Sequence, residues 1–276
     1  MNVYPEFIDK DRPVLEGEEA PYIGELEFET EVGRIIGMVL VPNHKPGEKH
    51  PAIVLLHGFP GHNSLLDIGH ALRRAGFVVF NPFAPGAWGS GGYYTFDGLI
   101  KAASAIVNYA ASEECQEKYH ICPDNIFLAG HSMGGYTCVN TMRRVPALKA
   151  GVCLMPFDYP WFFENGQLET IKDLFTLGTI LKQETETSMY ENALANYEET
   201  AFSKAAEDLK DRNMLFIGGA KDDVAPVDTM IEPLYNKIKE LGGKAEYILY
   251  DTDHSFNDCR FKVIKTIADY ICPMVD

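Results

Sequence analysis

The chain has 276 residues, of which 46% are hydrophobic and 12% aromatic, so it can bury the core of one α/β domain. Its 40 acidic residues outnumber its 24 basic ones, and the net charge of -16 disfavours binding to nucleic acid or to anionic membranes. The N-terminus lacks the basic and apolar segments of a signal peptide, and no apolar run is long enough to span a bilayer. We therefore expect a soluble, cytoplasmic protein, and the sequence leaves open whether it forms a homo-oligomer.

The predicted elements begin after a short acidic arm, residues 1–21. Residues 22–30 and 34–41 have the length and patterning of strands, with a turn at residues 31–33 that makes them a β-hairpin. The short apolar runs that follow are typical of strands buried on both faces of a parallel sheet. They cover residues 52–56, 77–80, 126–129, 151–155, 214–217 and 245–249.

Segments with helical spacing separate these strands, at residues 65–74, 99–110, 136–144, 230–241 and 261–271. The alternation predicts a doubly wound, mostly parallel sheet of about eight strands, with ligands bound beyond the carboxyl ends of the strands. Residues 156–209 break the alternation, because they are rich in aromatic side chains but lack a strand pattern. We predict a helical cap there, since so long a structureless loop is rare. Residues 22–155 and 210–276 then form the core.

The sequence Gly130-His131-Ser132-Met133-Gly134 stands between a predicted strand and a predicted helix. In that context G-x-S-x-G predicts a sharp turn that projects the serine hydroxyl, with glycines where a side chain would collide. The turn also places Ser132 near a helix N-terminus, where N–H groups stabilise developing negative charge. Five-residue patterns of this kind do arise by chance, but the flanking strand and helix favour Ser132 as a nucleophile.

A serine nucleophile needs a base, and in this architecture the acid and the histidine follow the serine along the chain. Only one of the 8 histidines, His254, comes after Ser132. It lies between the last predicted strand and the last predicted helix, so it should face the same end of the sheet. Asp222 and Asp223 follow the strand at 214–217, and either could orient His254.

The segment His57-Gly58-Phe59-Pro60-Gly61 follows the strand at 52–56, where this fold supplies one N–H group of an oxyanion hole. The other donor is the residue after the nucleophile, Met133. Pro60 has no N–H group, which makes Phe59 the best candidate for the second donor. For His57 we expect a structural role, tying this loop down through hydrogen bonds.

These residues together resemble the α/β-hydrolase superfamily, from about Tyr22 to the C-terminus. The glycine-rich residues 82–96 look like the loop shared by cinnamoyl or feruloyl esterases and prolyl-oligopeptidase-like hydrolases. The sequence departs from that pattern at Gly98, where the family often has an aspartate that opens the next helix. The resemblance implies that Asp222 is the acid, because the family's acid precedes a helix-opening proline by four residues, as Asp222 precedes Pro226.

We expect the chain to cleave a small-molecule carboxylic ester through an acyl-enzyme on Ser132. We also expect Trp161 and Phe162 of the cap, and Trp88 of the glycine-rich loop, to contact the substrate, although cap aromatics often form only a core. The chemistry needs no cofactor, and the sequence contains no metal-ligand spacing. Two alternatives remain: a prolyl-oligopeptidase-like peptidase or amidase, and a catalytically silent binding protein with this fold.

Overall fold

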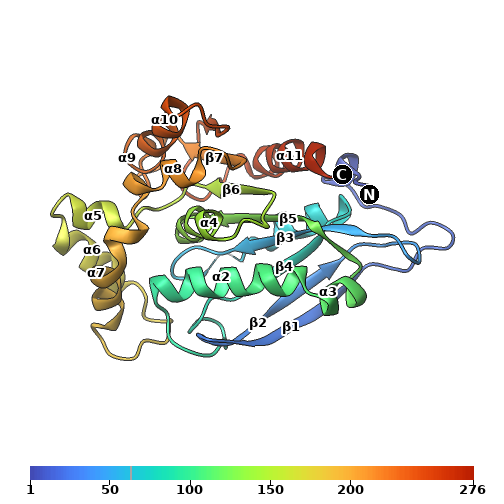
Figure 1. The fold of residues 1–276 in the computed structure, drawn as a ribbon, viewed down its shortest axis with the longest axis horizontal. Helices are drawn as coiled ribbons and strands as arrows, with labels where there is room; N and C mark the ends of the chain where they lie inside the picture. The colour runs from blue at the N-terminus through green and yellow to red at the C-terminus, as the bar shows by residue number, and fades with distance from the viewer. Residues whose placement is uncertain (63) are drawn as a thin grey trace.

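The computed structural model describes residues 1–62 and 64–276. Within these residues an eight-stranded sheet runs through the molecule in the order β1-β2-β4-β3-β5-β6-β7-β8 (Figure 1). β1, β2 and β4 pair antiparallel, whereas β4, β3 and the remaining strands pair parallel. The predicted α/β-hydrolase sheet is thus confirmed. Its strands are β1 (Tyr22–Thr30), β2 (Gly33–Val41), β3 (His50–Leu56), β4 (Val78–Pro82), β5 (Ile121–His131), β6 (Ala150–Leu154), β7 (Met214–Gly219) and β8 (Glu246–Tyr250).

The strand boundaries differ from the sequence prediction by a few residues. β5 begins at Ile121, because Ile121 pairs with His50 before a register shift in β3. The polar residues that follow Ile121 break the apolar pattern and hide this part of the strand from the sequence. β6 ends at Leu154, and Met155 lies beyond it with a φ of 43°.

Helices cover both faces of the sheet because successive residues of its strands point to opposite sides. In β3, Ile53 and Leu55 pack in the core beneath α1 (Leu66–Arg74) and α11 (Arg260–Ile271). Ala52 and Val54 pack in the opposite core, beneath α2 (Phe96–Ala111) and α4 (Met133–Arg144). Every residue of β3 is buried, as expected for a strand at the centre of a parallel sheet. The other core helices are α3 (Glu113–Lys118), α9 (Val227–Met230) and α10 (Glu232–Glu240).

Residues 156–209 contain helices and no strand within the described chain. In Figure 1 the helices α5 to α7 lie together at one end of the sheet, and the two termini lie at the other end. A hydrogen bond of 2.8 Å from the amino group of Met1 to the main-chain oxygen of Asp276 joins the termini there. The elements of this segment are α5 (Pro160–Glu164), α6 (Leu168–Thr176), α7 (Ser188–Thr200), η2 (Phe202–Lys204) and α8 (Ala206–Leu209).

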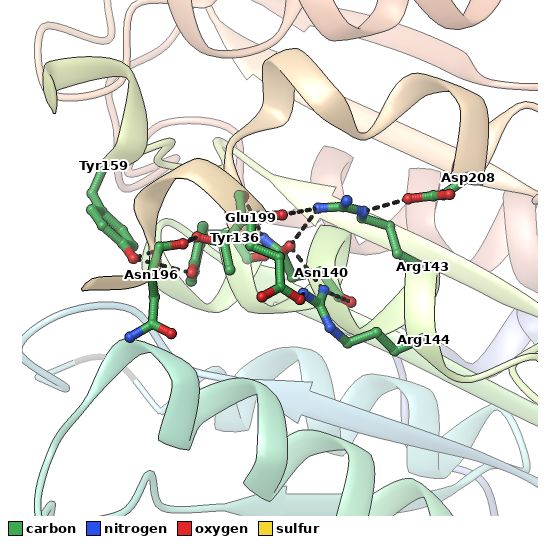
Figure 2. Close-up of polar contacts among 9 residues, drawn as sticks. Tyr136, Asn140, Arg143, Arg144, Tyr159, Asn196, Glu199 and Asp208 are labelled. Carbon is green, nitrogen blue, oxygen red and sulfur yellow. Dashed lines mark hydrogen bonds and ion pairs between the residues drawn. The ribbon is translucent and has the colours of Figure 1, made fainter. Parts of the chain in front are cut away.

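Polar side chains of α4 hold the end of α7 (Figure 2). Asn140 donates to the carbonyl of Thr200 at 3.0 Å, and Arg143 donates to the carbonyl of Glu199 at 2.9 Å. Arg143 also pairs with Asp208 at 2.9 Å. Because α4 begins directly after Ser132, these contacts link the segment 156–209 to the helix that follows the sharp turn of Ser132, called the elbow.

The N-terminal arm packs along the outside of the sheet, where η1 (Pro5–Phe7) lies near α1. The amide of Tyr4 donates to Ala75, and Arg74 donates to the carbonyls of Phe7 and Ile8. No helix in the described part of the chain is long and apolar enough to cross a bilayer.

Candidate active site

Ser132 occupies a strained turn between β5 and α4. Its φ of 56° and ψ of -116° lie in a backbone region that residues other than glycine rarely adopt. This conformation costs the folded state about 1–3 kcal/mol. Backbone hydrogen bonds hold it there. The amide of Ser132 donates to Leu154 at 2.9 Å, and its carbonyl accepts from Tyr136 and Phe157, both at 3.0 Å. The sequence pattern therefore corresponds to an actual elbow at the carboxyl end of the central strand.

Glycines are required around this turn because backbone atoms approach them closely. A Cβ atom at Gly130 would collide with the carbonyl of Gly134, and one at Gly134 would collide with the carbonyl of Leu56. A Cβ atom at Gly58 would lie 3.0 Å from that of Ser132. The loop after β3 therefore packs directly against the elbow.

Asp222, rather than Asp223, contacts His254. The Nδ1 atom of His254 lies 2.7 Å from the Oδ2 atom of Asp222. The Oδ1 atom of Asp222 accepts from the amides of Val224 and Ala225 at 2.9 and 2.7 Å, and this side chain is fully buried. Asp223 is exposed, and its side chain has no hydrogen bond or ion pair with the described residues. Since a carboxylate only accepts, Nδ1 of His254 is the donor of this bond, which leaves Nε2 as the nitrogen of the neutral ring that can accept a proton.

His131 places the loop of His254 beside the elbow, a role that the sequence analysis missed. Its Nε2–H group donates to the carbonyl of His254 at 2.7 Å, and the two rings lie 4.9 Å apart. Burial lowers the pKa of His131 from 6.5 to about 4, and the neighbouring imidazole of His254 adds to this effect, so His131 is neutral. No local signal predicts this contact, because 123 residues separate the partners.

The two predicted oxyanion donors lie in the turn of Ser132 and in the loop after β3 that packs against it. Met133 is the first residue of α4, where N–H groups lack intrahelical acceptors. Phe59 lies in the loop that approaches Ser132, and its ring packs against Tyr94 and Phe175 at centroid distances of 5.8 and 6.5 Å. Neither amide donates to an acceptor among residues 1–62 and 64–276.

His57 anchors the same loop. Its Nε2 atom accepts from the amide of Ala84 at 3.0 Å, so the proton is on Nδ1, which donates to the carbonyl of Gly58 at 2.8 Å. Burial lowers the pKa of His57 and keeps the ring neutral. These bonds join the loop after β3 to the glycine-rich segment that follows β4.

A pocket of about 580 Å³ lies between the segment 156–209 and the loop that carries Asp222. Trp161 and Phe162 line it, whereas Ser132 and His254 are not among the described residues of its wall. Contact of Trp161 and Phe162 with a substrate stays a prediction. Trp88 lies elsewhere: its indole N–H donates to the carbonyl of Gly61 at 2.8 Å, and 54% of the residue is exposed. Trp88 therefore supports the loop after β3, and its contact with a substrate stays a prediction.

Solved structures similar to this chain include both peptidases and an esterase. An acylaminoacyl peptidase of Pyrococcus horikoshii matches with a TM-score of 0.68 and 18% identity, over 92% of this chain and 42% of its own. A dipeptidyl peptidase 4 of Porphyromonas gingivalis matches with a TM-score of 0.66 and 18% identity, over 92% of this chain and 36% of its own. An esterase of Pyrococcus furiosus matches with a TM-score of 0.65 and 16% identity, over 95% of this chain and 97% of its own.

The chain thus spans less than half of the two peptidases and nearly all of the esterase. No curated protein sequence gives a significant match. The profile of the family described as alpha/beta hydrolase matches residues 53–269, from β3 into α11. On this match and on the sheet described above, the chain belongs to the alpha/beta hydrolase family.

Proposed function

We propose that this alpha/beta hydrolase is a serine esterase that cleaves a small carboxylic ester through an acyl-enzyme on Ser132. The observation that carries the proposal is the hydrogen bond of 2.7 Å between Asp222 and His254. It joins two loops at the same end of the sheet as the strained elbow of Ser132, and the bond from His131 to the carbonyl of His254 attaches the second loop to that elbow.

In the proposed reaction, Nε2 of His254 takes the proton of the Ser132 hydroxyl while Oγ attacks the ester carbonyl carbon. Asp222 keeps the imidazole in the required tautomer and stabilises its charged form without taking the proton. The amides of Met133 and Phe59 stabilise the oxyanion. The intermediate then expels the alcohol, which receives its proton from His254, and a water molecule deprotonated by His254 hydrolyses the acyl-enzyme.

The lining and the volume of the pocket suit a small organic substrate. Its walls are mainly aromatic and aliphatic, which suits the apolar part of an ester, and its volume of about 580 Å³ is within the range of small-molecule sites. The esterase of Pyrococcus furiosus, matched over 97% of its length, favours the same reaction class.

The test combines active-site labelling with turnover. Wild type should react with a fluorophosphonate probe and hydrolyse p-nitrophenyl butyrate, whereas Ser132→Ala should lose the label and at least about a thousandfold in kcat. Ser203→Ala is the matched control, because Ser203 lies in η2, and its hydroxyl bonds to Glu164.

Two results would contradict the proposal. An unlabelled and inactive wild-type protein would favour a catalytically silent binding protein of this fold. Faster turnover of aminoacyl anilides than of the matching esters would make the enzyme an amidase or peptidase instead.

A further inference from the structure

The pocket described above has two walls of different origin. One wall comes from α5, α6 and the residues that flank them, and the other comes from the loop after β7 together with α9. Both walls reach the candidate active site, because the amide of Phe157 bonds to the carbonyl of Ser132 and Asp223 directly follows Asp222. The pocket therefore adjoins the segments that carry Ser132 and Asp222. The lining residues are Phe157, Trp161, Phe162, Thr170, Asp173, Leu174, Leu177, Asp223, Val224, Pro226, Thr229 and Met230.

All the charged side chains in this lining are negative. Asp173 comes from the α6 wall and Asp223 from the opposite wall, and the described lining contains no lysine, arginine or histidine. Both carboxylates are exposed, and neither has an ion pair or a side-chain hydrogen bond in the described parts of the chain. Two carboxylates without a positive partner in the lining of one pocket attract a cation, the more so in a protein with a net charge of -16.

The nearest lysines in the sequence are paired elsewhere. Lys172, next to Asp173, bonds to Glu169 at 2.8 Å and lies over the ring of Tyr190. Lys221, close to Asp223, bonds to Asp251 at 2.9 Å. The positive partner of the two pocket carboxylates is therefore not supplied by these neighbours.

Aromatic rings complete the lining. Phe157 and Phe162 stack at a centroid distance of 5.5 Å, and Trp161 meets the edge of Phe162 at 5.2 Å. Ring faces attract organic cations, most strongly the face of tryptophan, and they also accept the apolar carbons that carry such a cation. Aromatic faces combined with free carboxylates suit an alkylammonium group better than a neutral hydrocarbon or an anion.

We propose that this pocket binds a substrate substituent that carries a positive charge on an apolar body, such as an amine or a quaternary ammonium group. The inference rests on the proposed function, since it names the substrate class of that site. Asp173 and Asp223 are the specificity-determining residues, and the rings of Trp161 and Phe162 hold the apolar part.

The first experiment compares esters that have the same shape and differ in charge. Choline acetate is paired with its carbon isostere, in which a tert-butyl group replaces the trimethylammonium group. A second pair carries the same two groups on the acyl side of a p-nitrophenyl ester. We expect kcat/KM to favour the cationic member of at least one pair by about fivefold or more, and the preference to weaken as salt is added.

Variants locate the source of the preference. Asp173→Asn and Asp223→Asn should each lower the ratio of cationic to neutral turnover, and the double variant should abolish the preference. Asp228→Asn, on α9 but outside the lining, is the matched control and should keep the wild-type ratio. Equal turnover of both members in both pairs would overturn the inference while leaving the esterase proposal intact.

A binding measurement decides the inference without catalysis. Choline and its tert-butyl isostere are titrated by calorimetry into Ser132→Ala, which cannot form an acyl-enzyme. Tighter binding of choline that disappears when Asp173→Asn and Asp223→Asn are added supports a cation site, even if the protein proves inactive. Equal binding of both alcohols, or a preference that survives both substitutions, would contradict it.

Discussion

The carboxyl ends of the sheet strands and the predicted cap segment, residues 156–209, differ in how far side chains hold them in place. At the strand ends, Ser132 is positioned by main-chain hydrogen bonds and by glycines that allow backbones to touch. Main-chain hydrogen bonds also attach the cap segment, at Phe157 and Lys182. Its α7 end, however, is held by side chains, because Asn140 and Arg143 bond to main-chain carbonyls there. A buried carboxyl, Asp158, also lies at the start of this segment.

The difference indicates how the two parts of the proposed function are divided. Proton transfer needs atoms held within a fraction of an ångström, which a parallel sheet and its turns provide. Recognition of a substrate varies within one fold, and helices held by side chains can change without disturbing the sheet. If this is correct, substitutions at the strand ends should abolish turnover, whereas substitutions at the attachment of the cap should mainly lower stability.

The largest effect is expected from Asp222→Asn. Asparagine keeps the size of the side chain but removes the charge that selects the tautomer of His254, so kcat should fall about ten-thousandfold. Asp223→Asn should change the turnover of a neutral ester by less than about tenfold, because Asp223 does not contact His254. Steady-state kinetics on p-nitrophenyl butyrate measures both. Equal losses in the two variants would contradict the assignment of Asp222.

A second substitution, Gly134→Ala, tests the packing of the elbow. The added methyl group would collide with the carbonyls of Leu56 and His57, so the elbow must shift. We expect a loss of about 4 kcal/mol or more in the free energy of unfolding, together with loss of turnover. Gly24→Ala is the control, because the nearest atom to a Cβ there lies at 3.5 Å, and it should unfold like wild type. Urea denaturation compares them.

Asn140→Ala addresses the attachment of the cap. It removes the donor to Thr200 and the acceptor for Arg143 and Arg144 from a buried position, which should cost about 1–3 kcal/mol. Hydrogen exchange in α7 should accelerate more than exchange in β5. The exposed Asn108 on α2 provides the control Asn108→Ala. If hydrogen exchange accelerated equally in α7 and across the sheet, the cap segment and the sheet would not be stabilised independently, which would contradict the comparison.

The smallest effect is expected from Asp158→Asn and depends on pH. Burial raises the pKa of Asp158 well above its usual 3.8, and the amide of Phe202 offsets only part of this. The folded protein therefore becomes progressively less stable, relative to a variant that cannot ionise, as the pH rises above 3.8 through the raised pKa. Asp158→Asn should have a higher Tm than wild type at about pH 8, and the gap should close at about pH 4. Asp211→Asn, at an exposed position, should show no such trend.

The sequence by itself determined the parts of the site that depend on local patterns. The alternation of apolar runs and helical spacing predicted the sheet, and G-x-S-x-G between a strand and a helix predicted the elbow, because steric limits on a sharp turn act over five residues. Chain order then left His254 as the single candidate base, since no other histidine follows Ser132.

Only the tertiary structure decided what depends on residues that are distant in the chain. Asp222 and Asp223 stand next to each other, but only Asp222 turns inward to His254, where it is held by the amides of Val224 and Ala225. The bond from His131 to His254 and the pocket lined by both Asp173 and Asp223 arise in the same way. Such contacts follow from the order of the strands and the packing of the helices. No single stretch of sequence determines that order or that packing.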